Sequence, residues 1–128
     1  MEVGSRYQLI FNLQENIYEG FIDLFHDDNP LHVDSNFAKS KGFDDKVMHG
    51  NILNGFVSYF IGKSLPIKNV VIHSQEIKFK MPVYLNQVLD FEAEISDYFE
   101  SVKTYQFKFK FLHEGKIVAK GKIQIGVI

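Results

Sequence analysis

The chain has 128 residues, 45% of them hydrophobic, which is enough for one buried core but not for two ordinary domains. Its 14 basic and 16 acidic residues give a formal charge of -2, so no global field attracts nucleic acid or an anionic membrane. The absence of cysteine excludes disulfides, thiolate catalysis and cysteine-based zinc sites.

The first 29 residues predict a strand followed by a helix. Apolar side chains alternate over residues 7–13, which indicates a strand with one buried face. A helix opening at Asn12 or Gln14 must end by Asn29, because Pro30 disfavours the helical conformation of its predecessor. Its apolar face at helical spacing comprises Ile17, Phe21, Leu24 and Phe25.

Two further helices are predicted before residue 64. Asp34 is expected to cap a short helix that ends at Gly42. The longest helical candidate covers residues 48–63, and its broad apolar surface predicts a buried helix. Three glycines weaken it by about 1 kcal/mol each relative to alanine, so we expect a backbone or ligand to approach closely there. These glycines are Gly50, Gly55 and Gly62.

Four half-buried antiparallel strands are predicted after Pro66. Their inward residues are Gln75, Ile77, Phe79 and Met81, then Leu89, Phe91, Ala93 and Ile95, then Tyr105, Phe107, Phe109 and Phe111, then Ile117, Ala119, Ile123 and Ile125. The outward faces are charged, and acidic residues 90–94 are expected beside Lys108 and Lys110 in cross-strand pairs. Glu114 and Gly115 mark a tight hairpin, and residues 98–101 cover the preceding turn.

This element order predicts an α+β fold in which one long helix has a single sheet to pack against. We therefore expect one hot-dog domain over residues 1–128, with an antiparallel sheet wrapped around a long central helix. The N-terminus lacks a basic region followed by an apolar run, and nowhere do roughly 18 apolar residues follow one another. The expected location is cytoplasmic.

Residues 26–32 combine many titratable groups with a stiff backbone. Pro30 fixes its own φ and pushes Asn29 into an extended conformation, so the neighbouring side chains are pre-positioned. Asp27 and His32 can converge on one water if the loop bends back, and a carboxylate beside an imidazole suits proton transfer near neutral pH. From the residues alone, an Asx turn and a capped helix with solvated histidines remain an alternative.

A metal site is a further alternative for the same segment, because imidazole and carboxylate groups are ordinary ligands. Its ligands would come from His26, Asp27, Asp28 and His32. No recognised spacing such as H-E-x-x-H is present, and His113-Glu114 lacks the second histidine. We therefore expect neither a metal nor a redox cofactor.

The stretch Asp27-Asp28-Asn29-Pro30-Leu31-His32, followed later by His49-Gly50, resembles the D-x-N-P-x-H and H-G signature of MaoC-like (R)-specific enoyl-CoA hydratases. Residues 75–83 also resemble the strand and proline turn that follow the central helix in that family, so the resemblance covers essentially the whole chain. It implies a hydro-lyase that adds water to 2-enoyl-CoA to give (R)-3-hydroxyacyl-CoA, or catalyses the reverse dehydration.

The resemblance also implies roles for individual residues. Asp27 and His32 would activate the water, and the N–H of Gly50, at a helix N-terminus, would stabilise the thioester enolate. The expected substrate-binding residues are Ser58, Asn29, His49 and Asn54, although His49 could instead order the loop at the helix start. The sequence departs from the family pattern at His26, where a small residue is common, and at Asn51, where a large apolar one is common.

The substrate partner implied by the resemblance is an acyl-CoA or acyl-carrier-protein thioester. A homodimer is also implied, because related hot-dog domains pair their sheets and build the acyl tunnel at the interface. Two other functions stay open: a 3-hydroxyacyl-[acyl carrier protein] dehydratase, and a non-catalytic acyl-thioester-binding subunit. A thioesterase would share the fold but not the motif. Candidate phosphate contacts, none preferred over the others, are Lys63, Lys68, Lys78, Lys80, Lys108, Lys110, Lys120 and Lys122.

Overall fold

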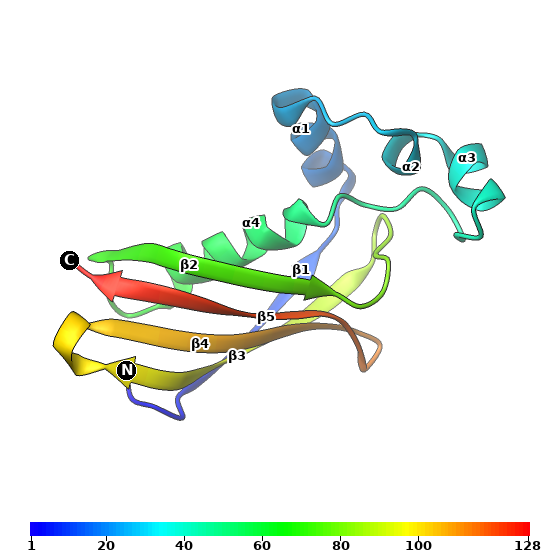
Figure 1. Ribbon diagram of the computed structural model, residues 1–128. Helices are drawn as coiled ribbons and strands as arrows, with labels where there is room; N and C mark the ends of the chain where they lie inside the picture. Colours follow the sequence, from blue (N-terminus) through cyan, green and yellow to red (C-terminus); the bar gives the residue numbers. More distant parts are fainter.

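Five antiparallel strands form one sheet in the computed structural model, which describes residues 1–128 (Figure 1). The strands are β1 (Arg6–Asn12), β2 (Val70–Phe79), β3 (Val88–Phe99), β4 (Thr104–His113) and β5 (Lys116–Val127), and their order in the sheet is β1-β3-β4-β5-β2. The helices are α1 (Glu15–Phe25), α2 (Pro30–Val33), α3 (Ser35–Ser40) and α4 (Asn51–Tyr59). The chain also contains two short helical turns, the π-helical η1 (Phe60–Ser64) and the 3-10 helical η2 (Glu100–Val102).

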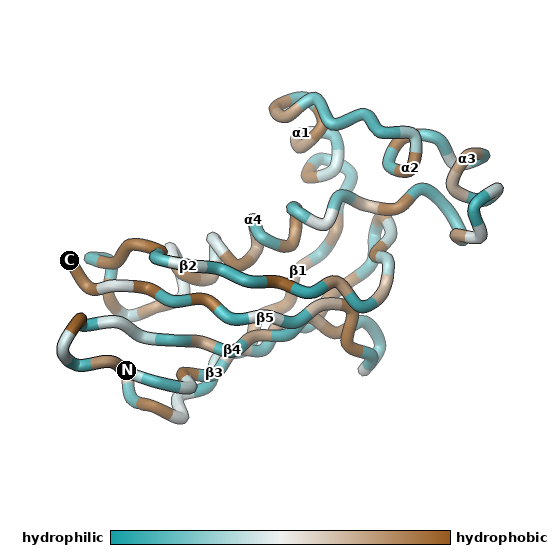
Figure 2. The backbone as a smooth tube through the Cα atoms, viewed as in Figure 1, coloured by the Kyte–Doolittle hydropathy of each residue, from teal (hydrophilic) through white to brown (hydrophobic).

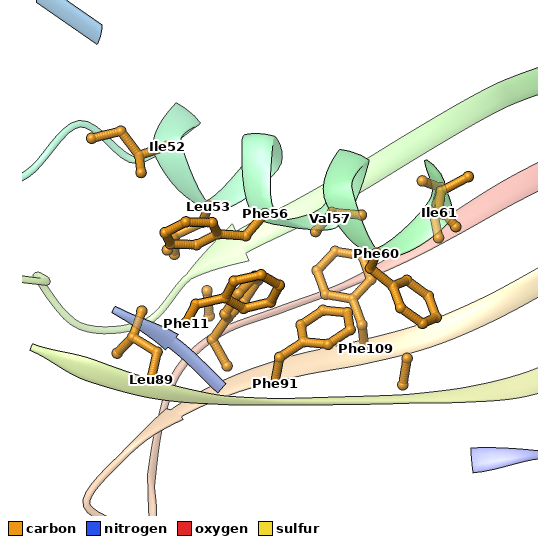
Figure 3. Packing of buried hydrophobic residues seen from close by; sticks show 14 of the residues in the cluster. Phe11, Ile52, Leu53, Phe56, Val57, Phe60, Ile61, Leu89, Phe91 and Phe109 are labelled. Atoms are coloured by element: carbon orange, nitrogen blue, oxygen red, sulfur yellow. The ribbon is translucent and has the colours of Figure 1, made fainter. Parts of the chain in front are cut away.

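The central helix α4 packs its apolar side against the inner face of the sheet (Figure 3). Phe11 of β1 stacks on Phe56 of α4 with ring centroids 4.4 Å apart, and Phe60 lies 5.0 Å from Phe91 of β3. Such aromatic pairs contribute about 0.5–1.5 kcal/mol each beyond the burial of their area. The predicted α+β hot-dog fold is confirmed: one antiparallel sheet is wrapped around one helix.

The predicted pairing of β3 with β4 is confirmed. Hydrophobic and hydrophilic residues alternate along the strands, as Figure 2 shows for β4 and β5. On the outward face Glu92 lies opposite Lys110 and Glu94 lies opposite Lys108. Lys110 Nζ is 3.3 Å from Glu92 Oε2. The charged face of these strands therefore contains the expected pairs for Glu92 and Glu94, whereas Asp90 lies opposite Leu112 and not opposite a lysine.

The hairpin between β4 and β5 turns at Glu114 and Gly115, both with positive φ, as predicted. The register of this pair shifts between Phe111 and Leu112. The predicted burial of Ile117 is wrong as a result: Ile117 is 39% exposed, whereas the next residue, Val118, is buried. A bulge changes which residues face the core, and simple alternation does not reveal it.

The predicted helix over residues 48–63 begins later and changes character at its end. The backbone N–H of Met48 donates to the Val83 carbonyl at 2.9 Å, so residues 48–50 lie outside α4. The last four residues of the predicted range belong to η1 (Phe60–Ser64), whose end is capped by the Lys68 ammonium. Lys68 Nζ donates to the carbonyls of Gly62, Lys63 and Leu65. Helix α4 therefore starts with Gly50 at its N-cap, beside the chain that connects β2 to β3.

Two surfaces predicted to be buried are largely exposed. Leu24 and Phe25 of α1 are 75% and 68% exposed, and β2 is exposed along most of its length. The prediction of a half-buried β2 is wrong: this strand is paired with β5 alone, and the buried strand residues of the core come from β1, β3, β4 and β5. Phe79 and Met81 are 51% and 45% exposed.

Helices α1, α2 and α3 gather beyond the N-terminal end of α4 (Figure 1). Asp34 caps α3 as predicted, since its Oδ1 accepts from the Phe37 N–H at 3.1 Å, although α3 ends at Ser40 and not at Gly42. Helix α2 was not predicted. None of the helices has the length and hydropathy needed to cross a bilayer.

Candidate active site

The loop between α1 and α2 carries the proposed acid/base residues. Helix α1 ends early, because His26 adopts a left-handed conformation with φ 59° and its N–H donates to the Ile22 carbonyl. Pro30 opens α2, and Asn29 caps it by accepting from the Leu31 N–H at 3.0 Å. Asn29 was predicted to bind substrate; in the structure its side-chain oxygen accepts a hydrogen bond that shapes the loop. This is the stiff turn that Pro30 was expected to produce.

His32 is held by a hydrogen bond that fixes its tautomer. Its Nδ1 lies 2.7 Å from the Val47 carbonyl oxygen. A carbonyl can only accept, so Nδ1 carries the proton and the neutral ring keeps a lone pair on Nε2. That Nε2 lies 3.9 Å from Asp27 Oδ2, and the His32 and Asp27 side chains are 18% and 49% exposed. The structure therefore brings together two proton acceptors that do not bond each other directly.

His49 lies beneath this pair and is buried, with 2% of its surface exposed. Its Nε2 lies 2.7 Å from the backbone carbonyl oxygen of Asp27, and its Nδ1 has no hydrogen-bond partner. The ring stacks on His32, with centroids 4.0 Å apart and planes inclined by 28°. This contact with the loop backbone is consistent with the loop-ordering role considered for His49, and its predicted substrate contact stays a prediction.

Gly50 presents a free backbone donor at the start of α4. Its N–H makes no hydrogen bond within the protein, whereas its carbonyl accepts from the Leu53 N–H. The Phe79 ring covers its Cα, and an added Cβ would lie 2.8 Å from Phe79 Cζ. At Gly50 the group that approaches closely is the Phe79 side chain, and not the backbone or ligand that was predicted. At Gly55 and Gly62 no protein atom lies within 4 Å of an added Cβ, so no backbone approaches these two glycines.

Two hollows meet at these groups. Asp27, His32, His49 and Gly50 line a cavity of about 500 Å³. A larger hollow of about 1300 Å³, which we call the α1–α4 groove, lies between β1, α1 and α4, and ten of its 18 lining residues are hydrophobic. Asp27 and Asn51 line both hollows, so an apolar groove opens beside the acid/base pair.

The other residues singled out by sequence lie at varying distances from this centre. Asn54 lines the α1–α4 groove, donates to Asn51 Oδ1 at 2.9 Å and accepts from the Gln75 amide. Ser58 is exposed and lines neither hollow. His26 and Asp28 also line neither.

The four-residue metal cluster considered from the sequence is wrong in its membership, because the turn separates His26 and Asp28 from the other two. The group whose ligand atoms lie within 4.8 Å of one another consists of Asp27, His32 and His49. Sequence reasoning missed the inclusion of His49 in this group. The signal available was the His49-Gly50 dipeptide at the start of the central helix.

Comparison with known proteins identifies one family and relatives that are hydratases or dehydratases. The family model described as "MaoC like domain" matches residues 6–117. An (R)-specific enoyl-CoA hydratase from Aeromonas caviae is 31% identical over 96 residues, which cover 75% of this chain and 72% of the relative. A mitochondrial 3-hydroxyacyl-[acyl-carrier-protein] dehydratase from Solanum lycopersicum is 29% identical over 112 residues, which cover 88% of this chain and 63% of the relative.

A solved structure has the same fold as this chain over its whole length. The structure of an (R)-hydratase from A. caviae superposes on this chain with a TM-score of 0.90 and 26% sequence identity. The superposition covers 100% of this chain and 98% of the other. The likeness therefore extends over the sheet, the central helix and the loops that carry the candidate site.

Proposed function

The chain belongs to the MaoC-like domain family, and from this premise we propose that it is a hydro-lyase acting on 2-enoyl and (R)-3-hydroxyacyl thioesters. The observation that carries the proposal is the meeting of Asp27, His32 and the free N–H of Gly50 in one cavity. These are the three groups that hydration of a conjugated thioester requires: two acceptors for a water and one donor for the enolate.

The acid/base step follows from the geometry of Asp27 and His32. The Oδ2 and Nε2 atoms are 3.9 Å apart, and both accept, so one water can donate a hydrogen to each. In the forward direction the pair removes a proton from this water as its oxygen forms a bond to C3 of the enoyl group. The electron pair of the C2–C3 double bond shifts toward the thioester carbonyl, and C2 then takes a proton from the pair.

The proposed role of Gly50 is to stabilise the negative charge that develops on the thioester oxygen. Its N–H is unpaired in the protein and lies at the positive end of the α4 dipole. A donor fixed in this way stabilises an enolate without reorganising during the reaction, and loss of one such donor typically costs about 10²- to 10³-fold in rate. Phe79 covers the Cα of Gly50, so a side chain here would crowd the site.

The α1–α4 groove is the proposed location of the acyl chain. It is large and mostly apolar, and it shares Asp27 and Asn51 with the catalytic cavity. An acyl chain lying in the groove would place its thioester end at the acid/base pair. Burial of the chain would favour binding by roughly 0.8 kcal/mol per methylene group.

A homodimer is proposed from the exposed edge of the sheet. β2 has ten residues, pairs only with β5, and presents its other edge without a partner. A long open edge of this kind is a template for a further strand, so two copies are expected to join through β2. Light scattering on the purified protein, together with a Ser74→Pro variant in β2, tests this: the wild type should have twice the mass of the chain, and the variant less.

The function is tested by giving the purified protein crotonyl-CoA and following loss of the conjugated enoyl absorbance, with the configuration of the product determined on a chiral phase. Turnover to (R)-3-hydroxybutyryl-CoA is the expected result. A parallel reaction uses the same acyl group on acyl carrier protein. Turnover of the carrier-protein ester alone would support the carrier-protein dehydratase, in line with the Solanum relative. Binding of acyl-CoA without turnover of either ester would replace the hydro-lyase proposal with a non-catalytic binding subunit.

A further inference from the structure

The buried His49 has no part in the mechanism above, yet it contacts both members of the acid/base pair. We propose that His49 is a positioning residue: its Nε2–H holds the backbone of Asp27, and its ring supports the ring of His32. The expected effect of His49 on the reaction rate rests on the proposed function. The positioning itself is a property of the fold and can be measured without substrate.

The loop that carries Asp27 depends on a contact from outside the loop. Its other hydrogen bonds are local: the Asn29 N–H donates to Asp27 Oδ1 at 3.3 Å, and the Asp28 N–H donates to the His26 carbonyl at 3.1 Å. His26 is also in the left-handed region, which is unfavourable for a residue with a side chain. The His49 Nε2 bond to the Asp27 carbonyl, which spans 22 positions of sequence, anchors this strained turn to the start of α4.

His49 supports His32 through its ring. The two rings stack at 4.0 Å, and the rings of Phe21 and Tyr18 also lie beside His49, at 4.6 Å and 5.9 Å. His32 itself is fixed by the Val47 carbonyl, two residues before His49. The catalytic cavity is thus arranged by one short segment, residues 47–50: it orients His32, holds Asp27 and ends in the free N–H of Gly50.

This segment is itself held on two sides. The Val47 N–H donates to the Leu31 carbonyl, and the Met48 N–H donates to the Val83 carbonyl, each at 2.9 Å. Met48 is 1% exposed. His49 therefore connects the exposed turn of the site to a part of the chain that is both buried and hydrogen-bonded.

Burial alone does not explain a histidine at this position. The His49 Nδ1 is buried without a partner, which is an unfavourable arrangement that a phenylalanine or leucine would avoid. The feature that only a donor side chain supplies is the bond from Nε2–H to the Asp27 carbonyl. This bond accounts for a histidine, and not an apolar residue, at this buried position.

Three variants test the inference. His49→Phe keeps an aromatic ring in the buried position and removes the donor. His49→Gln places an amide N–H near the position of Nε2 and restores it. His113→Phe is the matched control, because His113 Nδ1 also lies against a backbone carbonyl, that of Val88 at 3.3 Å, but lines neither hollow.

The first measurement is hydrogen exchange over residues 26–32, which needs no substrate. His49→Phe should increase the exchange rate of the Asp28 and Asn29 amides about tenfold or more, while His49→Gln and His113→Phe leave them near the wild-type rate. Unchanged protection of this loop in His49→Phe would overturn the inference. If His49→Phe does not fold, the His49→Gln variant decides. Wild-type protection of the loop amides in His49→Gln supports the inference, and exchange of these amides as fast as in the unfolded chain overturns it.

The second measurement is the hydration rate. His49→Phe should lower kcat about 10- to 100-fold with KM changed less than about threefold, because a misplaced base slows the chemical step more than it weakens binding. His49→Gln should recover most of this loss, and His113→Phe should match the wild type. Equal rates for His49→Phe and the wild type would overturn the inference. A wild-type protein that hydrates no enoyl thioester would instead refute the proposed function, and the exchange measurement would still decide the role of His49.

Discussion

Replacing Gly55 with leucine tests whether the α1–α4 groove holds the acyl chain. Gly55 lines the groove from α4, and no heavy atom lies within 4 Å of a Cβ added to it. A leucine side chain can therefore extend into the groove without displacing the core. Leucine also has a helix propensity higher than glycine by roughly 0.8–1 kcal/mol, so the variant should be at least as stable as the wild type.

The size of the effect follows from the area that the groove can bury. Octenoyl-CoA carries four more methylene groups than crotonyl-CoA, and each is worth about 0.8 kcal/mol when buried, giving up to roughly 3 kcal/mol. This corresponds to about 200-fold in kcat/KM for the longer chain relative to the shorter one. Leucine at position 55 should remove most of this advantage, while kcat/KM for crotonyl-CoA changes less than about threefold.

The assay compares kcat/KM for the two substrates in the wild type, Gly55→Leu and Gly62→Leu. Gly62 is the matched control, because it also has no neighbour within 4 Å of an added Cβ but lies in η1 and does not line the groove. Gly62→Leu should keep the wild-type ratio. If Gly55→Leu and Gly62→Leu show the same ratio as the wild type, the acyl chain does not lie in this groove.

Three further predictions concern the stability of the fold. Tyr18→Phe removes the bond from the Tyr18 hydroxyl to the His32 carbonyl, 2.6 Å long, and should lower the free energy of unfolding in urea by about 1 kcal/mol; an unchanged urea midpoint would contradict the role of this bond. Lys120→Glu should raise the melting temperature at low salt and not at 1 M salt, because Lys120 lies directly opposite Lys78 and Lys110, and like charges in these positions repel. Burial, and after it the charge of Tyr105, raises the pKa of Tyr7 above its usual value near 10. The raised pKa means that the folded state loses stability only as the pH rises above about 10, so Tyr7→Phe should shift alkaline unfolding, followed by circular dichroism, to higher pH, and should leave stability at pH 8 free of this effect.

The sheet was predictable because its periodicity is strong and its inner face is covered. Phe91 and its neighbours on β3 alternate with acidic residues, and the structure buries the former and pairs the latter. The prediction was wrong for β2, where residues of similar pattern are exposed. Periodicity identifies a strand with two different faces, but the position of that strand in the sheet, and hence what covers it, depends on the tertiary arrangement.

The candidate site was predictable where its geometry is local. Pro30 and Asn29 determine the turn through their own backbone and side-chain preferences, so the stiff loop followed from the sequence. The contact of His49 with Asp27 was not predictable in the same way, because it joins residues 22 positions apart. The α1–α4 groove also depends on how two helices and an edge strand are placed, and no residue pattern specifies its shape.

The central claim is that Asp27 and His32 act together on one water. The most direct measurement is kcat/KM for hydration of crotonyl-CoA by Asp27→Asn and His32→Ala, with folding of each variant verified by its thermal melt. Each variant is expected to lose about 10²- to 10⁴-fold in kcat/KM while remaining folded. Folded variants that both retain kcat/KM within about threefold of the wild type would contradict the claim.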